Sequence, residues 1–216
     1  MFSKIGKVLL LIQVLKVESK ASATESKKIV GGESSPIDYA YLLSMQRISS
    51  GSWRHFCGGV IIDENNFLTA AHCVKGFNTS QMSVFAGTRN LNDELKGVRR
   101  NVSMCIVHPD YVEVQTSDIA LCKISIPWVF NGTVNKVKLD QTFVGENVDC
   151  LLTGWGSIFF MRDLGFSFLN NLIYPTDLRR SNFLTMSNAE CRSKGFAIDD
   201  TQICTQPRLF KGACAG

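Results

Sequence analysis

His72 is the residue whose neighbours best suit catalysis by a general base. It follows a run of small residues, Thr69-Ala-Ala71, and precedes Cys73, with Cys57 sixteen positions upstream. A disulfide between the two cysteines would close a loop worth about 3 kcal/mol and would fix the backbone of the histidine. Asp118 begins a segment typical of a buried strand, from which its carboxylate can reach a histidine on a neighbouring strand. A base oriented by a carboxylate is the arrangement that activates a serine nucleophile.

The segments that must position these side chains are short apolar runs separated by Gly, Asn, Asp and Ser. Many short strands at this spacing favour an all-β barrel or sandwich. A later segment, Asn188–Lys194, has the pattern of a helix, and Ser187 before it is a suitable N-cap. The clearest strand-like runs are Gly59–Ile62, Met82–Phe85, Ile119–Ile124 and Val148–Leu152.

Residues 1–23 resemble a signal peptide and predict secretion. Lys4 and Lys7 accompany the apolar run Val8–Leu15, and Ala21–Ala23 offers small residues for cleavage. The alternative is an amphipathic first helix. The run is too short to span a bilayer, which needs about 20 apolar residues. In an oxidising compartment the eight cysteines would form disulfides. Glycosylation sequons at Asn78, Asn101 and Asn131 fit the same compartment.

Composition excludes several other classes of protein. The chain is 45% apolar and 19% charged, as in a globular domain and unlike a disordered chain. Its net charge of +4 is scattered, and it has no nucleic-acid-binding motif. The three histidines, His55, His72 and His108, do not combine with cysteines or carboxylates at a zinc-site spacing. We therefore expect no metal, no cofactor, no nucleic-acid partner and no membrane partner.

Five segments, in their order and spacing, resemble the chymotrypsin-like serine proteases. The resemblance implies an all-β fold of two antiparallel six-stranded β-barrels packed side by side, with a catalytic cleft between them. Residues 29–138 would form the first barrel, and residues 139–216 would form an incomplete second barrel. In this family His72 would be the general base and Asp118 the acid that orients it. The five segments are Ile29–Gly32, His55–Gly59, Thr69–Cys73, Asp118–Leu121 and Thr153–Gly156.

The resemblance also implies a zymogen that is activated by proteolysis. Residues 24–28 would form the activation peptide, and a trypsin-like protease would cut between Lys28 and Ile29. In the family, the new α-amino group enters the core and pairs with the aspartate beside the nucleophilic serine, which orders the oxyanion hole. A buried charge of this kind is tolerated only with its partner.

The segment Lys211–Gly216 resembles the approach to the nucleophile. Gly216 would supply one oxyanion-hole amide, and Gly212 matches the floor of the specificity pocket. Trypsin-like members carry Asp at that position, so Gly212 indicates a chymotrypsin- or elastase-like preference for apolar side chains. The family would continue with Asp-Ser-Gly-Gly after Gly216. We therefore expect the sequence to be a fragment without the serine, and the 216-residue chain itself to be inactive.

The cysteines follow the family only in part. Cys105 and Cys122 lie outside the family's usual set, and they flank Asp118 on segments expected to be adjacent strands. Such a position would allow an additional disulfide between them. For the other six cysteines, the resemblance implies the disulfides Cys57–Cys73 and Cys191–Cys204. It implies that the partners of Cys150 and Cys214 would lie beyond residue 216.

Two functional hypotheses follow from the sequence. The first is a secreted, extracellular serine endopeptidase that acts on protein or peptide substrates, is activated by a trypsin-like protease and is a target for protease inhibitors. The second is a non-catalytic homologue that acts as a binding or regulatory protein. The presence of His72, Asp118 and the activation site at Lys28 favours the enzyme.

Overall fold

In this computed structural model, residues 33–112, 116–156 and 175–207 are described, and they form mainly β-strands. The helical elements are the 3₁₀ turns η2 (Ala71–Cys73) and η3 (Thr79–Gln81) and the α-helix α1 (Asn188–Ser193). The strands are β1 (Glu33–Ser34), β2 (Leu42–Ser49), β3 (Ser52–Ile61), β4 (Asn66–Thr69), β5 (Met82–Ala86), β6 (Val98–Val107), β7 (Ala120–Ile124), β8 (Asp149–Gly154), β9 (Arg179–Met186) and β10 (Cys204–Pro207).

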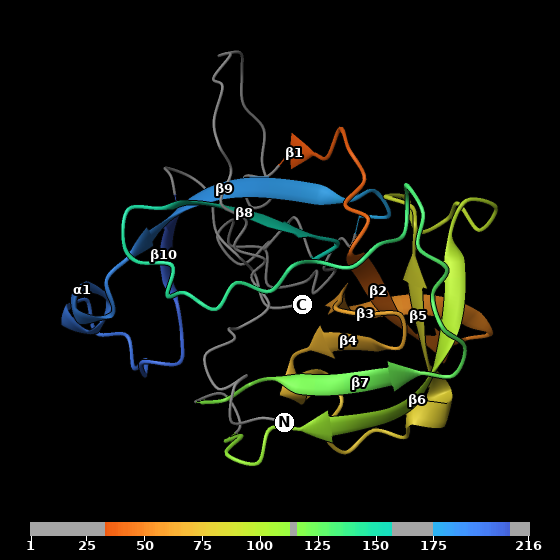
Figure 1. Cartoon of the computed structure of the whole chain (residues 1–216), viewed down its shortest axis with the longest axis horizontal. Coiled ribbons are helices and arrows are strands. Elements are labelled where there is room, and N and C mark those ends of the chain that lie inside the picture. The colour runs from red at the N-terminus through yellow and green to blue at the C-terminus, as the bar shows by residue number, and fades with distance from the viewer. Residues whose placement is uncertain (1–32, 113–115, 157–174, 208–216) are drawn as a thin grey trace, which may run out of the picture.

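Six antiparallel strands close into a barrel in the order β2-β3-β4-β7-β6-β5 (Figure 1). Closure pairs every strand on both sides, so the barrel has no free edge. Alternate side chains point inward, as expected for strands, and the interior includes the fully buried Leu43, Ile61 and Phe67. The β2–β3 hairpin turns through Ser50 and Gly51, which both have positive φ values of 51° and 75°. That combination is typical of the tightest hairpin turn.

A second sheet of four strands is organised around β9. β8 pairs along one edge of β9, whereas β1 and β10 share the other edge at opposite ends, and every pairing is antiparallel. The barrel and this sheet confirm the all-β fold class expected from the resemblance. β1 pairs with β9, although it lies within residues 29–138, the range expected to form the first barrel. The boundary between residues 138 and 139 stays a prediction.

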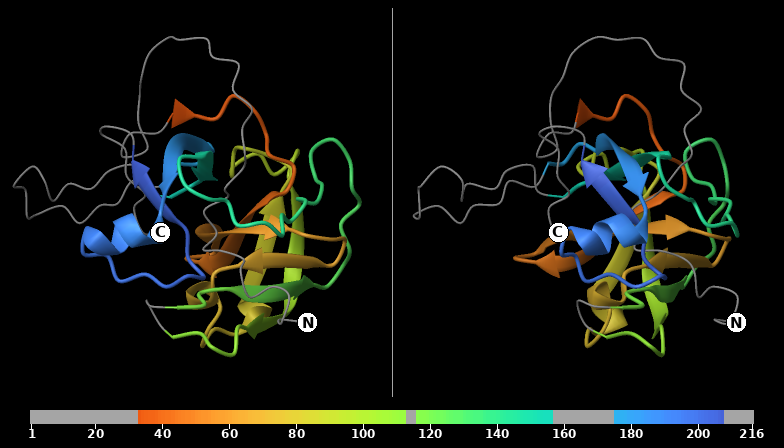
Figure 2. Two further views of the ribbon diagram at one scale, coloured as in Figure 1. Left: turned by 60° about the vertical axis from the view of Figure 1, so that its left-hand side comes forward. Right: turned by 90° about the vertical axis from the view of Figure 1, so that its left-hand side faces the viewer.

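The barrel and the second sheet are joined by packing and by hydrogen bonds. Leu42 of β2 packs with Trp155 and Leu178 in one buried apolar cluster. The Arg89 carbonyl accepts hydrogen bonds from the Trp155 indole N–H at 3.0 Å and from the Leu178 backbone N–H at 2.7 Å. Figure 2 shows the second sheet lying against the barrel in both views. The two parts therefore form one continuous body.

The helix α1 begins where the sequence predicts. Ser187 is its N-cap, and the serine Oγ accepts a hydrogen bond from the Glu190 backbone N–H at 3.2 Å. In Figure 1 the helix lies at the left edge, on the side of the molecule away from β5 and β6. Within the described ranges, no helix is long and apolar enough to cross a membrane.

Candidate active site

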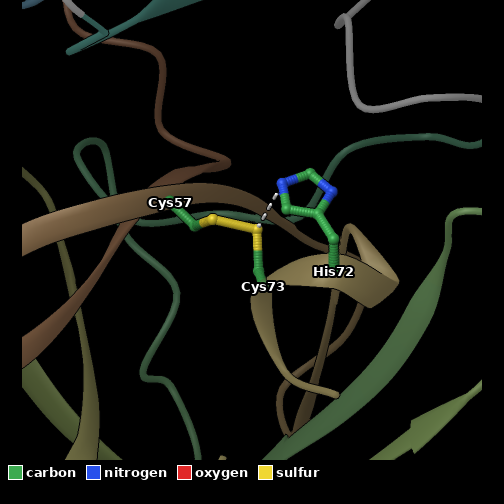
Figure 3. Close-up of side chains that lie close together, drawn as sticks. All are labelled: Cys57, His72 and Cys73. Atoms are coloured by element: carbon green, nitrogen blue, oxygen red, sulfur yellow. Dashed lines mark hydrogen bonds between the residues drawn. A yellow bond between two sulfur atoms is a disulfide. The ribbon is translucent and has the colours of Figure 1, made fainter. Parts of the chain in front are cut away.

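The turn η2 carries His72 directly after strand β4. Ala71 and Cys73 of this turn are buried, whereas the His72 side chain between them is 50% exposed. Cys73 forms a disulfide with Cys57 of β3, with their Cα atoms 6.2 Å apart. Figure 3 shows the imidazole standing beside this disulfide. The bridge therefore ties the backbone of the histidine to the barrel wall.

The register of β4 and β7 brings Asp118 to His72. The two strands are antiparallel and pair Thr69 with Ala120. The chain therefore leaves β4 toward η2 at the same end of the pair at which it enters β7. Asp118 lies two residues before Ala120, so its side chain reaches His72 although 46 positions separate the two residues.

Both carboxylate oxygens of Asp118 interact with His72. Oδ2 lies 2.6 Å from the imidazole Nδ1, and Oδ1 accepts a hydrogen bond from the His72 backbone N–H at 2.9 Å. The backbone N–H of Ala71 donates to the same carboxylate. With 18% of its side chain exposed, Asp118 is partly shielded from water. The carboxylate therefore fixes both the ring and the backbone of the histidine.

This contact shifts both pKa values. The hydrogen bond to Asp118 raises the pKa of His72, aided by Coulombic attraction and opposed by burial. Burial raises the pKa of the Asp118 carboxyl, but hydrogen bonds from His72 and Ala71 and the attraction to His72 lower it overall. Asp118 is consequently ionised at neutral pH, and it favours the protonated form of the ring.

The ionised carboxylate also selects the tautomer of His72. A carboxylate only accepts hydrogen bonds, so Nδ1 carries the proton that faces Asp118. In the neutral ring Nε2 is then unprotonated and available as a base. Nε2 lies 3.4 Å from the Cys73 Sγ atom (Figure 3). The arrangement can accept a proton at Nε2 and hold it there as an imidazolium stabilised by Asp118.

Cys57, His72 and Cys73 form the one cluster in the described part of the chain that could hold a metal ion on distance alone. Their ligand atoms lie within 4.8 Å of one another. The two sulfur atoms, however, are joined in a disulfide. Because the thiolate is the form of cysteine that binds metals, we assign no metal to this cluster.

The other two histidines do not join the site. His55 lies in β3, where Nδ1 is 2.8 Å from the Ser44 Oγ atom, and its ring centroid is 5.7 Å from that of Trp155. Burial lowers the pKa of His55 to about 4, so the ring is neutral at physiological pH. His108 lies in a turn, where its Nδ1 accepts a hydrogen bond from the Asp110 backbone N–H at 3.2 Å.

Two further disulfides have the partners expected from the sequence. Cys105 and Cys122 occupy directly paired positions on β6 and β7, and they form a cross-strand disulfide. Cys191 of α1 is bonded to Cys204 of β10, which anchors the helix to the second sheet. With the bridge beside His72, these account for the three disulfides of the described residues.

Cys150 of β8 is buried, and it forms no disulfide with any residue that the structure describes. Burial, followed by the nearby charge of Asp149, raises the pKa of Cys150 to about 11. A thiol of this kind is almost fully protonated at neutral pH and reacts slowly, because the thiolate is the nucleophile. The partner that the resemblance implies for Cys150, beyond residue 216, stays a prediction.

Several predicted sites lie outside the described residues, and the three sequons lie within them. The side chains of the sequon asparagines Asn78, Asn101 and Asn131 are exposed. The predicted activation site, specificity-pocket residue, oxyanion-hole residue and last cysteine fall outside the described ranges: Lys28, Ile29, Gly212, Gly216 and Cys214.

Sequence reasoning missed the turn that delivers Asp118. Ser117, the residue before it, has a φ of 54°, in the left-handed region that favours Gly, Asn and Asp. The Ile119 N–H donates a hydrogen bond to the Ser117 carbonyl at 2.7 Å, which tightens the chain on both sides of Asp118. A serine gives no sequence signal for this conformation. Sequence reasoning also missed Ser44, because its contact with His55 depends on the pairing of β2 with β3.

Comparison with known proteins covers nearly the whole chain after the predicted leader. A family model described as Trypsin matches residues 29–216. Hypodermin-B from Hypoderma lineatum is 33% identical over 196 residues, which cover 88% of this chain and 70% of that protein. Chymotrypsin-2 from Vespa crabro is 33% identical over 191 residues, which cover 87% of this chain and 79% of that protein. The chain therefore belongs to the trypsin family, the chymotrypsin-like serine proteases.

Proposed function

We propose that this protein is a secreted serine endopeptidase in which His72 is the general base and Asp118 orients and stabilises it. The observation that carries the proposal is the 2.6 Å contact between His72 Nδ1 and Asp118 Oδ2 in a member of the trypsin family. The second hydrogen bond, from the His72 backbone to the same carboxylate, supports it further. The nucleophile would be a serine that follows Gly216.

The geometry supports an acyl-enzyme mechanism. His72 Nε2 takes the hydroxyl proton as the serine oxygen attacks the scissile carbonyl carbon, and Nε2 then gives that proton to the leaving amine. In the second half-reaction, Nε2 takes a proton from water, the hydroxide attacks the acyl carbonyl, and the proton returns to serine as the acid leaves. Asp118 stays ionised throughout, in keeping with its lowered pKa. The Gly216 amide would donate a hydrogen bond to the oxyanion.

The proposed activation requires a cut between Lys28 and Ile29 by a trypsin-like protease. Ile29 lies four positions before β1 in the sequence, and β1 pairs with β9 of the second sheet. Glu33 of β1 also forms an ion pair with Arg180 of β9, with an N–O distance of 2.7 Å. In the family, the new N-terminus produced by such a cut orders the oxyanion hole.

The proposed substrates are proteins and peptides with an apolar residue before the scissile bond. Gly212, at the position of the pocket floor, would provide no anion to attract Lys or Arg. Protease inhibitors that present such a residue would be the natural antagonists. A relative named Chymotrypsin-2 supports a chymotrypsin-like preference over a trypsin-like one.

The decisive test is to read the transcript beyond the codon for Gly216 and to express the complete zymogen. Cleavage after Lys28 should give an enzyme that hydrolyses peptides with apolar residues before the scissile bond faster than peptides with Lys or Arg. The His72→Ala variant is the matched control and should lose this turnover. A stop codon after Gly216 in the authentic transcript would instead favour a non-catalytic homologue.

The 216-residue chain provides a complementary test. Expressed alone and cut after Lys28, it should hydrolyse peptides no faster than its His72→Ala variant, because no serine is in place to form an acyl-enzyme. A tail that begins Asp-Ser-Gly-Gly should restore turnover. Activity of the chain alone that disappears in His72→Ala would mean that a different nucleophile operates.

A further inference from the structure

The β2–β3 hairpin and the segment that follows His72 carry basic side chains without acidic ones. Residues 47–56 and 72–81 contain Arg47, Arg54 and Lys75 and no Asp or Glu. The whole chain, in contrast, has 19 Asp and Glu against 23 Lys and Arg. The local excess of positive charge favours association with anionic groups.

Arg47 and Arg54 face each other across the hairpin. They are directly paired in the register of β2 and β3, which places two like charges on one face of the sheet. This arrangement is unfavourable in the isolated protein. Both side chains are exposed, and neither forms an ion pair with any residue that the structure describes. A carboxylate from another molecule, placed between them, would be attracted to both and would reduce their repulsion.

Two aromatic rings hold Arg47 in place. Its Cζ atom lies 5.5 Å from the ring centroid of Phe56 and 5.8 Å from that of Phe77. Both distances are within the range of a cation–π contact. A stacked guanidinium loses less conformational freedom when it binds a carboxylate. The Phe77 side chain is 48% exposed. We call the set Arg47, Arg54, Phe56 and Phe77 the arginine–phenylalanine surface.

This surface adjoins His72 through the Cys57–Cys73 disulfide. Phe56 directly precedes Cys57, and Phe77 follows Cys73 by four residues, so the disulfide connects the two halves of the surface. His72 Nε2 lies 3.4 Å from the Cys73 Sγ atom (Figure 3). Because Nε2 gives its proton to the leaving amine, the leaving half of the substrate must pass on this side of the ring.

We propose that the arginine–phenylalanine surface binds acidic side chains in the leaving half of the peptide substrate. This proposal rests on the proposed function and adds a substrate preference to it. A substrate carboxylate would lie between the guanidinium groups of Arg47 and Arg54, and neighbouring apolar atoms of the substrate would contact Phe77. Exposed ion pairs are individually weak and screened by salt, so the expected preference is graded rather than absolute.

The test compares kcat/KM for peptide pairs that differ by Asp against Asn, or Glu against Gln, at successive positions after the scissile bond. The complete activated enzyme should prefer the acidic member, and the preference should shrink as NaCl is raised from about 0.05 to about 0.5 M. In the Arg47→Gln/Arg54→Gln variant, the ratio of kcat/KM for the acidic peptide to that for the neutral peptide should fall about fivefold. The Arg47→Lys/Arg54→Lys variant should keep most of the preference, because it keeps the charges.

Arg192→Gln is the matched control, because it removes one exposed arginine from α1, far from the hairpin, and should leave the preference unchanged. If the double variant folds poorly because it lacks the stacked Arg47, the single variant Arg54→Gln replaces it in the test. An unchanged preference in Arg54→Gln and in the double variant would overturn the proposal, as would an equal loss in Arg192→Gln.

A binding experiment separates this proposal from the proposed function. A fluorescently labelled acidic peptide should bind the 216-residue chain more tightly than its Asn/Gln counterpart, and Arg54→Gln should weaken only the acidic complex. If the complete protein hydrolyses no peptide, the proposed function fails and this measurement decides alone. Equal binding of the two peptides would then reject the arginine–phenylalanine surface as an acid-binding site.

Discussion

The two histidines beside the Cys57–Cys73 disulfide have opposite electrostatic properties. His55 lies two residues before Cys57, and burial lowers its pKa to about 4, with Ser44 as a neutral hydrogen-bond partner. His72 lies directly before Cys73, and the hydrogen bond to Asp118 raises its pKa. The same disulfide fixes both segments of backbone. The surroundings of each ring therefore decide its protonation, because burial disfavours the cation whereas a carboxylate stabilises it.

The comparison teaches which features distinguish a functional histidine from a structural one. His72 combines an ionised partner at Nδ1 with a half-exposed side chain. His55 has a hydroxyl partner and a neutral ring packed near Trp155. Only the first arrangement can hold a transferred proton near neutral pH. Three predictions test this contrast, and a fourth tests the turn that delivers Asp118.

The largest expected effect is that of Asp118→Asn. In the complete activated enzyme, kcat should fall about ten-thousandfold, because Asn no longer holds the productive tautomer or stabilises the imidazolium. The pKa of His72, followed by NMR of the ring protons, should fall at the same time. Ser44→Ala is the control and should leave the titration of His72 unchanged. Nearly full activity in Asp118→Asn would refute the assigned role.

Removal of individual disulfides should separate stability from function. The Cys57–Cys73 and Cys105–Cys122 bridges span 16 and 17 positions, so the loss of either should cost about 3 kcal/mol of unfolding free energy. Only the Cys57→Ser/Cys73→Ser variant should also change the titration of His72. Urea unfolding and NMR of the same samples would check both statements. Equal effects of both variants on His72 would show that the disulfide beside the ring has no special role.

Acidification should reveal the contrast between the histidines in stability. The pKa of His55 is about 4 in the folded state and higher when unfolded, so the unfolded chain binds the additional proton. Its contribution to stability therefore falls by about 2 kcal/mol between about pH 6.5 and pH 4, allowing for partial exposure. His72 acts oppositely, because its raised pKa gives a stabilisation that is complete below about pH 6.5 and is lost as pH rises through the folded pKa.

Urea unfolding of wild type, His55→Gln and His72→Gln between about pH 4.5 and pH 8 would measure these slopes. Wild type should lose more stability than His55→Gln on acidification. His72→Gln should lack a stabilisation that wild type has at acidic pH. The same slope in His55→Gln and wild type would show that His55 does not have the lowered pKa described above.

The smallest expected effect is that of Ser117→Gly, which should stabilise the protein by about 0.5 kcal/mol. The φ of 54° at Ser117 is unfavourable for a side chain with a Cβ atom, and Gly adopts it freely. Ser125→Gly is the control in a segment without positive φ, and it should destabilise by a similar amount. Thermal or urea unfolding would measure both. Destabilisation by Ser117→Gly would mean that the serine side chain contributes more than the backbone strain costs.

Much of the fold is already present in local patterns of the sequence. The apolar runs near residues 59–62, 82–85, 119–124 and 148–152 all lie in or beside strands, and Ser187 caps the helix as predicted. These features depend on side-chain alternation and on one capping hydroxyl, which act over a few residues. Family resemblance supplied what local patterns could not, namely the expected partnership of His72 and Asp118.

The sequence by itself determined the strand-rich fold class, the family and the positions of the cysteines that form disulfides. Only the tertiary structure decided that β4 and β7 pair so that Thr69 meets Ala120, which brings His72 to Asp118. It also decided that Ser44 reaches His55 and that Arg47 lies against both Phe56 and Phe77. The physical reason is that such contacts depend on the register of strands distant in sequence. A one-residue slip would turn the same side chains to the opposite face.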